Sequence, residues 1–244
     1  MTGPLCASAG TPASLARPCE LPIARAMQDS AQDYARDFGE SVAARLRAAP
    51  GMQRVPSPRL DLFTRRGFVP DDMRARLIAL IDANRRPSTI ADPNGDDYFR
   101  TSETCDLPPQ EPVVQQLRAL FTQASGIDPR YAEPSQGQRY DVGQEFKNHT
   151  DYFEPTGADY QKFCAVAGQR TWTFMVYLND VDAGGGTRFK VVKKTFQPEA
   201  GRLVCWNNRR ADGSPNPATL HQGMKVRKGL KYVITQWYRE NEWR

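Results

Sequence analysis

The second half of the chain is a series of short β-type segments separated by turns, and this pattern restricts the fold more than any other feature. Turns rich in glycine or proline, such as Asp182-Ala-Gly-Gly-Gly186 and Pro198-Glu-Ala-Gly201, lie between the segments. Many short strands of this kind, with little helix among them, are typical of a β-sandwich or β-barrel. The segments that we expect to form strands are residues 138–142, 171–178, 188–192, 202–206, 220–226 and 230–238.

Two amphipathic helices are predicted before this β-rich region. The first begins near Pro70-Asp-Asp72, where early acidic residues suit the helix dipole, and ends near Asn84. The second covers about residues 111–124. We therefore predict a mainly β fold with flanking α-helices, a double-stranded β-helix (jelly roll) whose helices pack on one sheet. Shorter strands are expected at residues 60–63 and 67–69, with an edge strand at 98–102.

The chain divides into three predicted parts. Residues 1–24 are rich in Pro, Ala, Gly and Ser and are expected to form a flexible N-terminal tail. Residues 25–58 are predicted to hold a helix and a linker, and residues 59–244 to form the jelly-roll domain, with a catalytic core at about 137–240. The first helix either packs on the core or binds a partner through the apolar residues that recur every four positions, Tyr34, Phe38, Val42 and Leu46.

Composition excludes several classes of partner. The formal net charge is +5, spread along the chain, which allows a weak preference for acidic partners. No run of Lys and Arg with interleaved aromatic residues occurs, so we expect no nucleic-acid partner. No apolar run is long enough to span a membrane. Five cysteines without a Cys-x-x-Cys pair, and an N-terminus that makes a poor signal peptide, favour a cytoplasmic protein with reduced thiols.

The only two histidines of the chain are the candidate metal ligands. His149 has a carboxylate two positions later, Asp151, and His221 opens a later strand. We expect His149 and Asp151 to point the same way from one strand end and His221 to arrive from a strand across the barrel. Two imidazoles and one carboxylate on one face of an ion suit Fe(II) in O₂ chemistry. The alternative is zinc with three protein ligands and a water.

Lys231 favours iron with a keto-acid cosubstrate over hydrolytic zinc. It follows His221 after a turn, and a hairpin of this size is expected to bring its ammonium group alongside His221. A buried lysine needs a counter-charge, which the distal carboxylate of 2-oxoglutarate supplies. Tyr140 and Thr187 could donate hydrogen bonds to the same carboxylate. The alternative for Lys231 is an ordinary surface lysine.

Several aromatic residues and two loops have no settled role. The aromatic residues either line the pocket or pack in the core, and the loops at residues 85–110 and 152–170 could hold a peptide. The aromatic residues are Tyr152, Phe153, Trp172, Trp206 and Trp237.

Four motifs in this order resemble the prolyl 4-hydroxylases. Residues 139–151, with Arg-Tyr-Asp-Val-Gly-Gln-Glu-Phe-Lys-Asn-His-Thr-Asp, resemble the segment around the first iron ligands. Residues 177–189, 198–206 and 221–237 resemble the Tyr-Leu-x-Asp-Val segment with its glycines, the strand after it, and the stretch with the second histidine and the lysine. One departure is Gln144, where the family usually has a second glycine.

This resemblance implies an enzyme that depends on Fe(II), 2-oxoglutarate and O₂, with ascorbate as reductant. His149, Asp151 and His221 would hold the iron, while Lys231, Tyr140 and Thr187 would bind 2-oxoglutarate. The expected reaction is hydroxylation of an unactivated C–H, most simply a prolyl residue of a peptide or protein, with release of succinate. A free amino acid or small molecule as substrate, and a metal-binding β-sandwich without turnover, stay as alternatives. The oligomeric state is left open.

Overall fold

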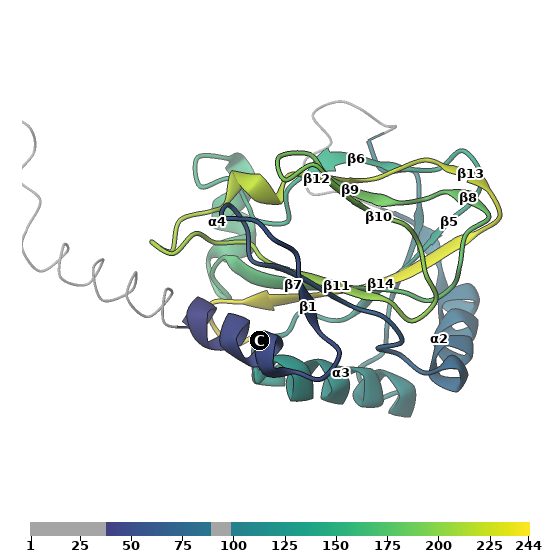
Figure 1. The fold of residues 1–244 in the computed structure, drawn as a ribbon, viewed down its shortest axis with the longest axis horizontal. Coiled ribbons are helices and arrows are strands. Elements are labelled where there is room, and N and C mark those ends of the chain that lie inside the picture. Colours follow the sequence, from purple (N-terminus) through teal and green to yellow (C-terminus); the bar gives the residue numbers. More distant parts are fainter. Residues whose placement is uncertain (1–37, 89–98) are drawn as a thin grey trace, which may run out of the picture.

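The computed structural model describes residues 38–88 and 99–244, and its strands form two facing sheets (Figure 1). The large sheet has eight strands, and the small sheet has four. In spatial order the large sheet consists of β1 (Gln53–Arg54), β2 (Leu62–Arg65), β11 (Leu203–Asn207), β7 (Arg170–Tyr177), β14 (Lys231–Arg239), β5 (Gln136–Tyr140), β4 (Glu103–Asp106) and β3 (Arg86–Pro87). The small sheet consists of β10 (Lys194–Phe196), β9 (Thr187–Phe189), β12 (His221–Gly223) and β6 (Phe146–His149), and β13 (Val226–Lys228) pairs separately with β8 (Ala183–Gly184). The predicted double-stranded β-helix is confirmed.

Strand β7 shows how the sequence places one core on each side of the large sheet. Alternate residues of a strand point to opposite faces. Phe174 and Val176 belong to the core beneath the helices, whereas Met175 and Tyr177 belong to the core between the two sheets. The space between the sheets is therefore lined by one face of β7.

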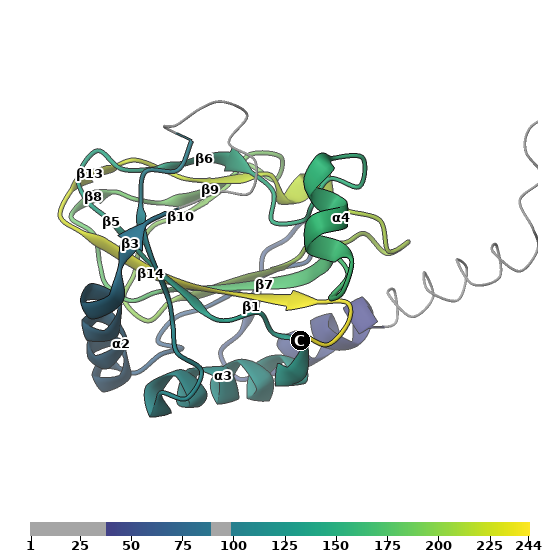
Figure 2. The ribbon, with the colours of Figure 1, turned by 180° about the vertical axis from the view of Figure 1, so that it is seen from behind.

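The helices cover the outer face of the large sheet, as predicted (Figure 2). Helix α2 (Asp71–Asn84) buries Leu77 and Ile81, and helix α3 (Pro112–Ser125) buries Leu117 and Phe121 against the sheet. Gly126 ends α3 in the left-handed conformation, φ 73°, which glycine adopts without steric cost. A short helix, α4 (Ala158–Cys164), follows the candidate ligand Asp151.

The predicted first helix is helical over residues 38–48. Its side chains Val42 and Leu46 are buried in the core with α3 and the large sheet. Of the two alternatives for this helix, packing on the core and binding a partner, these two residues fit packing on the core. The predicted tail 1–24, residues 25–37 and Tyr34 lie outside the described residues.

One of the short predicted strands is wrong, and another is only partly formed. Residues 67–69 are not a strand; the N–H groups of Phe68 and Val69 both donate to the carbonyl of Gly201. The edge strand expected at 98–102 is confirmed in part, because Arg100 forms an antiparallel bridge with Phe146 of β6 at the edge of the small sheet. Residue 98 lies outside the described residues. Short runs carry too few residues for periodicity to fix their boundaries.

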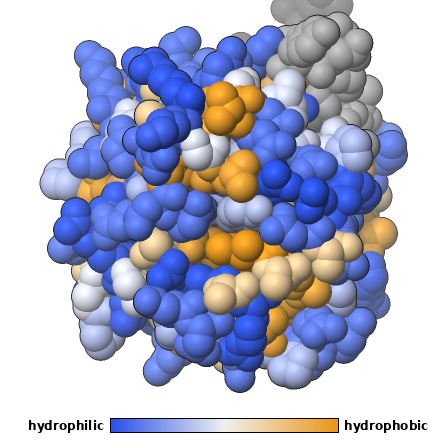
Figure 3. Space-filling model, turned by 90° about the vertical axis from the view of Figure 1, so that its right-hand side faces the viewer, coloured by the Kyte–Doolittle hydropathy of each residue, from blue (hydrophilic) through white to orange (hydrophobic). Residues whose placement is uncertain are grey.

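The described helices are all too short or too polar to cross a bilayer. At the end of the molecule where α2 and β13 lie, a band of apolar side chains crosses a mainly hydrophilic surface (Figure 3). Val142 and Leu230, on turns, are among the exposed apolar side chains of the described chain.

Candidate active site

The three predicted metal ligands lie together at the end of the small sheet. His149 is the last residue of β6, and it is the direct cross-strand partner of His221, the first residue of β12. Asp151 follows two residues after the end of β6, and its Oδ1 lies 3.9 Å from His149 Nε2. One potential ligand atom from each of the three residues lies within 4.8 Å of the other two. The three residues could therefore hold one metal ion.

One detail of the prediction for His221 is wrong. His221 comes from the neighbouring strand of the same sheet, not from a strand across the barrel. The reason is the long connection after β6, which crosses to the large sheet and returns before β12 begins. Direct pairing of β6 with β12 then brings the two rings to a centroid distance of 4.2 Å.

Both imidazoles are oriented by backbone carbonyls. His149 Nδ1 lies 2.7 Å from the carbonyl oxygen of Lys147, and His221 Nδ1 lies 2.8 Å from that of Thr219. A neutral imidazole that donates from Nδ1 keeps the lone pair on Nε2, which is the arrangement that metal-bound histidines use. Burial and the neighbouring His221 lower the pKa of His149 to about 3, so this ring is neutral at ordinary pH.

The carboxylate of Asp151 is oriented by a chain of buried hydrogen bonds. Thr173 Oγ1 donates to Asp151 Oδ2 over 2.7 Å and accepts from Asn208 Nδ2 over 2.8 Å. Trp206 Nε1 in turn donates to Asn208 Oδ1 over 3.1 Å. The second carboxylate oxygen, Oδ1, is left facing the histidines. We refer to Trp206, Asn208 and Thr173 as the Asp151 relay.

The pKa of Asp151 is lowered although burial alone would raise it. Electrostatic interactions with His221, His149 and Arg170, together with the Thr173 hydrogen bond, outweigh the burial. Asp151 is therefore a carboxylate at neutral pH, as a metal ligand must be.

Arg170 supports the same loop from the other side. Its Nη1 lies 3.3 Å from the backbone oxygen of Asp151, and its guanidinium lies 4.0 Å above the ring of Trp237. Glu133 accepts two hydrogen bonds from Arg170, 2.6 and 2.8 Å, and one from Arg239, 3.0 Å. This buried ion cluster fixes the position of the Asp151 backbone.

Sequence reasoning did not identify the Asp151 relay, Arg170 or Glu133. One available signal was the pair of threonines at 171 and 173, which put hydroxyls on one face of an otherwise apolar strand. A hydroxyl on a buried strand needs a partner.

Lys231 faces the metal ligands from the opposite sheet. The predicted hairpin beside His221 is wrong, because β13 intervenes and Lys231 opens β14 of the large sheet. Its cross-strand partner is Tyr140, whose ring centroid lies 4.7 Å from Lys231 Nζ. Lys231 is only 2% exposed, so the alternative of a surface lysine is also wrong. In the described part of the chain no carboxylate lies within ion-pair distance of it.

The pocket between Lys231 and the metal ligands holds about 380 Å³ of empty space, a volume that includes open solvent. Burial lowers the pKa of Lys231 to about 7. Thr187 also lines the pocket and accepts a 2.6 Å hydrogen bond from Tyr177, and Tyr140 donates to Gln138 over 3.4 Å. The wall consists of Gln138, Tyr140, Phe146, His149, Asp151, Met175, Thr187, Trp206, His221, Gly223, Lys231, Val233, Thr235 and Trp237.

A buried ammonium without an acidic partner leaves an uncompensated charge in this pocket, which is costly unless a ligand brings the counter-charge. A ligand that carries a carboxylate at one end and metal-binding oxygens at the other would satisfy both ends. The donor set of two imidazoles and one carboxylate therefore fits Fe(II), and the lysine fits 2-oxoglutarate.

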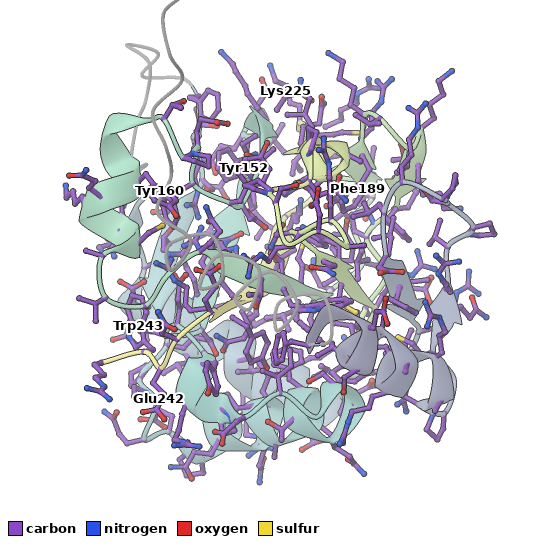
Figure 4. The ribbon with its side chains drawn as sticks, turned by 90° about the vertical axis from the view of Figure 1, so that its left-hand side faces the viewer. Tyr152, Tyr160, Phe189, Lys225, Glu242 and Trp243 are labelled. Carbon is purple, nitrogen blue, oxygen red and sulfur yellow. The ribbon has the colours of Figure 1, made fainter. Side chains whose placement is uncertain are left out.

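The aromatic residues with unsettled roles divide between pocket and core. Trp206 and Trp237 line the pocket, whereas Trp172 packs in the core beneath the helices. Phe153 stacks on Phe163 of α4 with ring centroids 5.3 Å apart. Tyr152, labelled in Figure 4, is partly buried and does not line the pocket.

Comparison with known proteins agrees with this geometry. The sequence profile of the 2OG-Fe(II) oxygenase superfamily matches residues 135–239. Human prolyl 4-hydroxylase subunit alpha-1 is 32% identical over 160 residues, which is 64% of this chain but only 30% of that protein. Probable prolyl 4-hydroxylase 8 of Arabidopsis thaliana is 27% identical over 207 residues, 74% of this chain and 69% of the plant protein.

A solved structure shows the same relationship. The 2OG complex of the viral collagen prolyl hydroxylase vCPH from Paramecium Bursaria Chlorella virus-1 superposes with a TM-score of 0.56 at 26% identity. The match covers 73% of this chain and 95% of the viral protein. Residues 135–239 therefore form a domain of the 2OG-Fe(II) oxygenase superfamily, a class of dioxygenases. Within that superfamily the domain is similar to those of the prolyl 4-hydroxylases.

Proposed function

We propose that this protein hydroxylates an unactivated C–H bond of a prolyl residue in a peptide or protein and converts 2-oxoglutarate to succinate and CO₂. The observation that carries the proposal is the pocket itself. Three metal-ligand side chains face a buried lysine that has no carboxylate partner among the described residues, across a space lined by both sheets. Similarity to proteins named as prolyl hydroxylases supports proline as the target.

The residues would act as follows. His149 and His221 would bind the iron through Nε2 and Asp151 through Oδ1, since their other polar atoms are held by the protein. Lys231 would pair with the distal carboxylate of 2-oxoglutarate, and Tyr140 and Thr187 would assist from either side of the lysine. When bound, Fe(II) with 2-oxoglutarate supplies the oxidising chemistry that activates O₂ for insertion into a C–H bond.

The rest of the site would keep these groups in place and limit water. The Asp151 relay and Arg170 hold the carboxylate from both sides, so little reorganisation is needed when metal arrives. Apolar side chains of Met175, Trp206 and Val233 lie between the sheets. They exclude water from the space next to the metal ligands, which strengthens the attraction between Lys231 and a carboxylate.

The proposal extends to a cytoplasmic location and to ascorbate as reductant. In the described part of the chain Cys105, Cys164 and Cys205 are all unpaired, which supports a reducing compartment. Omission of ascorbate from turnover assays, with an expected fall in the number of turnovers before inactivation, tests the reductant.

Succinate release measured with Fe(II), 2-oxoglutarate and candidate substrates tests the main proposal. We expect proline-containing peptides to stimulate release and to gain one oxygen atom by mass spectrometry. His149→Ala and His221→Ala should lose both turnover and iron binding. Stimulation by free amino acids alone would favour the small-molecule alternative, and metal binding without any succinate would favour a non-catalytic protein.

A further inference from the structure

A second groove, separate from the cosubstrate pocket, carries a concentrated positive charge. Its empty space, about 1100 Å³ including open solvent, lies between three segments, residues 54–61, Val191 and residues 209–218. Four of its lining residues are arginines, and the single acidic residue among them is Asp61. We call it the arginine groove; its lining is Arg54, Ser57, Pro58, Arg59, Leu60, Asp61, Val191, Arg209, Arg210, Ala211, Asn216, Pro217 and Ala218.

Two of the four arginines form no ion pair within the described part of the chain. Arg54 lies 3.3 Å from Asp61, and Arg209 lies 2.5 Å from Glu240. Arg59 and Arg210 are exposed and form no ion pair with any residue that the structure describes. The charge of Arg210 also acts on the nearby Asp212, but neither guanidinium is bonded to a carboxylate of the described chain, so the groove presents two exposed guanidinium groups to a ligand.

The arginine groove is continuous with the wall that carries a metal ligand. Its last lining residues, Pro217 and Ala218, lie in the 3₁₀ helix Pro217–Thr219, which ends two residues before His221. The carbonyl of Thr219 orients His221. Arg210 also lies close enough to Tyr152, the residue after Asp151, for its charge to act on the phenol. Figure 4 views this end of the molecule, with Tyr152 and Phe189 labelled.

The groove is held open by the protein's own bonds. Asn216 is buried, and its Nδ2 donates to the carbonyl of Arg59 over 2.9 Å, so the two main walls are tied together. The backbone N–H of Asn216 donates to the carbonyl of Asn208, a member of the Asp151 relay. The same short segment thus fixes both the groove and the metal site.

We propose that the arginine groove binds an acidic segment of the peptide or protein substrate, next to the residue that enters the active site. This inference rests on the proposed function. Carboxylates match guanidinium groups in charge and geometry. The apolar lining from Pro58, Leu60, Val191 and Pro217 suits a polypeptide. No aromatic residue lines the groove, so it has no surface on which nucleic-acid bases would stack.

The test compares two proline-containing peptides of equal length, one with flanking Asp and Glu and one with Asn and Gln instead. The variant Arg59→Gln/Arg210→Gln is compared with wild type and with Arg76→Gln, a partly exposed arginine on α2 outside the groove. For the acidic peptide we expect KM to rise about fivefold to tenfold in the double variant only. The effect is modest because each ion pair between an exposed arginine and a peptide carboxylate contributes little to the binding free energy. The kcat values and the amide peptide should be unaffected.

Binding measured without turnover separates this inference from the proposed function. Fluorescence anisotropy with the labelled acidic peptide, at low and high salt, should show weaker binding in the double variant even if no peptide is hydroxylated. Equal binding of the two peptides by wild type would overturn the inference. So would an acidic preference that survives in the double variant, or variant-sensitive binding of a single-stranded oligonucleotide in place of the acidic peptide.

Discussion

Replacement of Thr173 by valine tests whether the Asp151 relay controls the metal site. Thr173 is fully buried on β7, and valine has the same shape but no hydroxyl. The change removes two hydrogen bonds, the 2.7 Å bond to Asp151 Oδ2 and the 2.8 Å bond from Asn208 Nδ2. Nothing else near the three ligands is altered.

The expected size follows from the charge of the acceptor. A hydrogen bond to an ionised group is worth about 1.5–3 kcal/mol. At about 1.4 kcal/mol per factor of ten, its loss corresponds to roughly 10-fold to 100-fold weaker metal binding. The buried amide of Asn208, left without an acceptor, should also lower the free energy of unfolding by about 1–3 kcal/mol.

The assay is competition for Fe(II) with a chelator under anaerobic conditions, beside urea unfolding of the metal-free proteins. Thr171→Val is the matched control. Thr171 lies on the same strand and donates 3.2 Å to the carbonyl of Tyr238, away from the ligands, so its loss should affect stability alone. If Thr173→Val binds iron within about twofold of Thr171→Val, the relay does not position Asp151 and our reasoning is refuted.

Two further predictions concern charge. Burial lowers the pKa of Lys231 to about 7, so the ammonium is lost as pH rises above that value. Calorimetry should then show that the affinity for 2-oxoglutarate falls by up to about tenfold per pH unit between about pH 7 and about pH 9. In Lys231→Arg the affinity should stay constant over this range, because the guanidinium keeps its charge. The pKa of Glu133 is lowered, since Arg170 and Arg239 outweigh its burial. Its ion cluster therefore stabilises the fold above the usual glutamate range and is lost as pH falls through the lowered pKa. Glu133→Gln should lower the free energy of unfolding by about 3–5 kcal/mol at neutral pH. The difference in stability between wild type and this variant should become smaller in acid. An unchanged urea midpoint at neutral pH would contradict this.

The sequence predicted which residues meet, but not how they meet. His149, Asp151 and His221 were chosen because the chain has only two histidines and one has a nearby carboxylate, and the structure brings these three together. The predicted position of His221 across the barrel was wrong, because the strand that pairs with β6 depends on which distant strands share a sheet. Hydrophobic periodicity describes one strand at a time and contains no information on its neighbours.

Supporting residues were harder to predict for a related reason. Thr173 and Asn208 are common in strands and turns, and they become informative only when long-range pairing puts them beside Asp151. Lys231 was predicted correctly as a pocket residue from its chemistry, yet it approaches from the opposite sheet. Chemical requirements are thus readable from residue types, whereas the direction of approach is decided by topology.

The direct pairing of His149 with His221 determines which changes of chain length the protein tolerates. Turns and loops between the two strands can gain or lose residues, because they run over the surface and only their ends are fixed. An inserted residue within β12 is different, because side chains alternate between the two faces of a strand. One extra residue there would turn the imidazole of His221 away from its partner while β12 stayed paired. Natural relatives should therefore vary in the length of the 211–214 turn and keep the spacing from His221 to Gly223 constant.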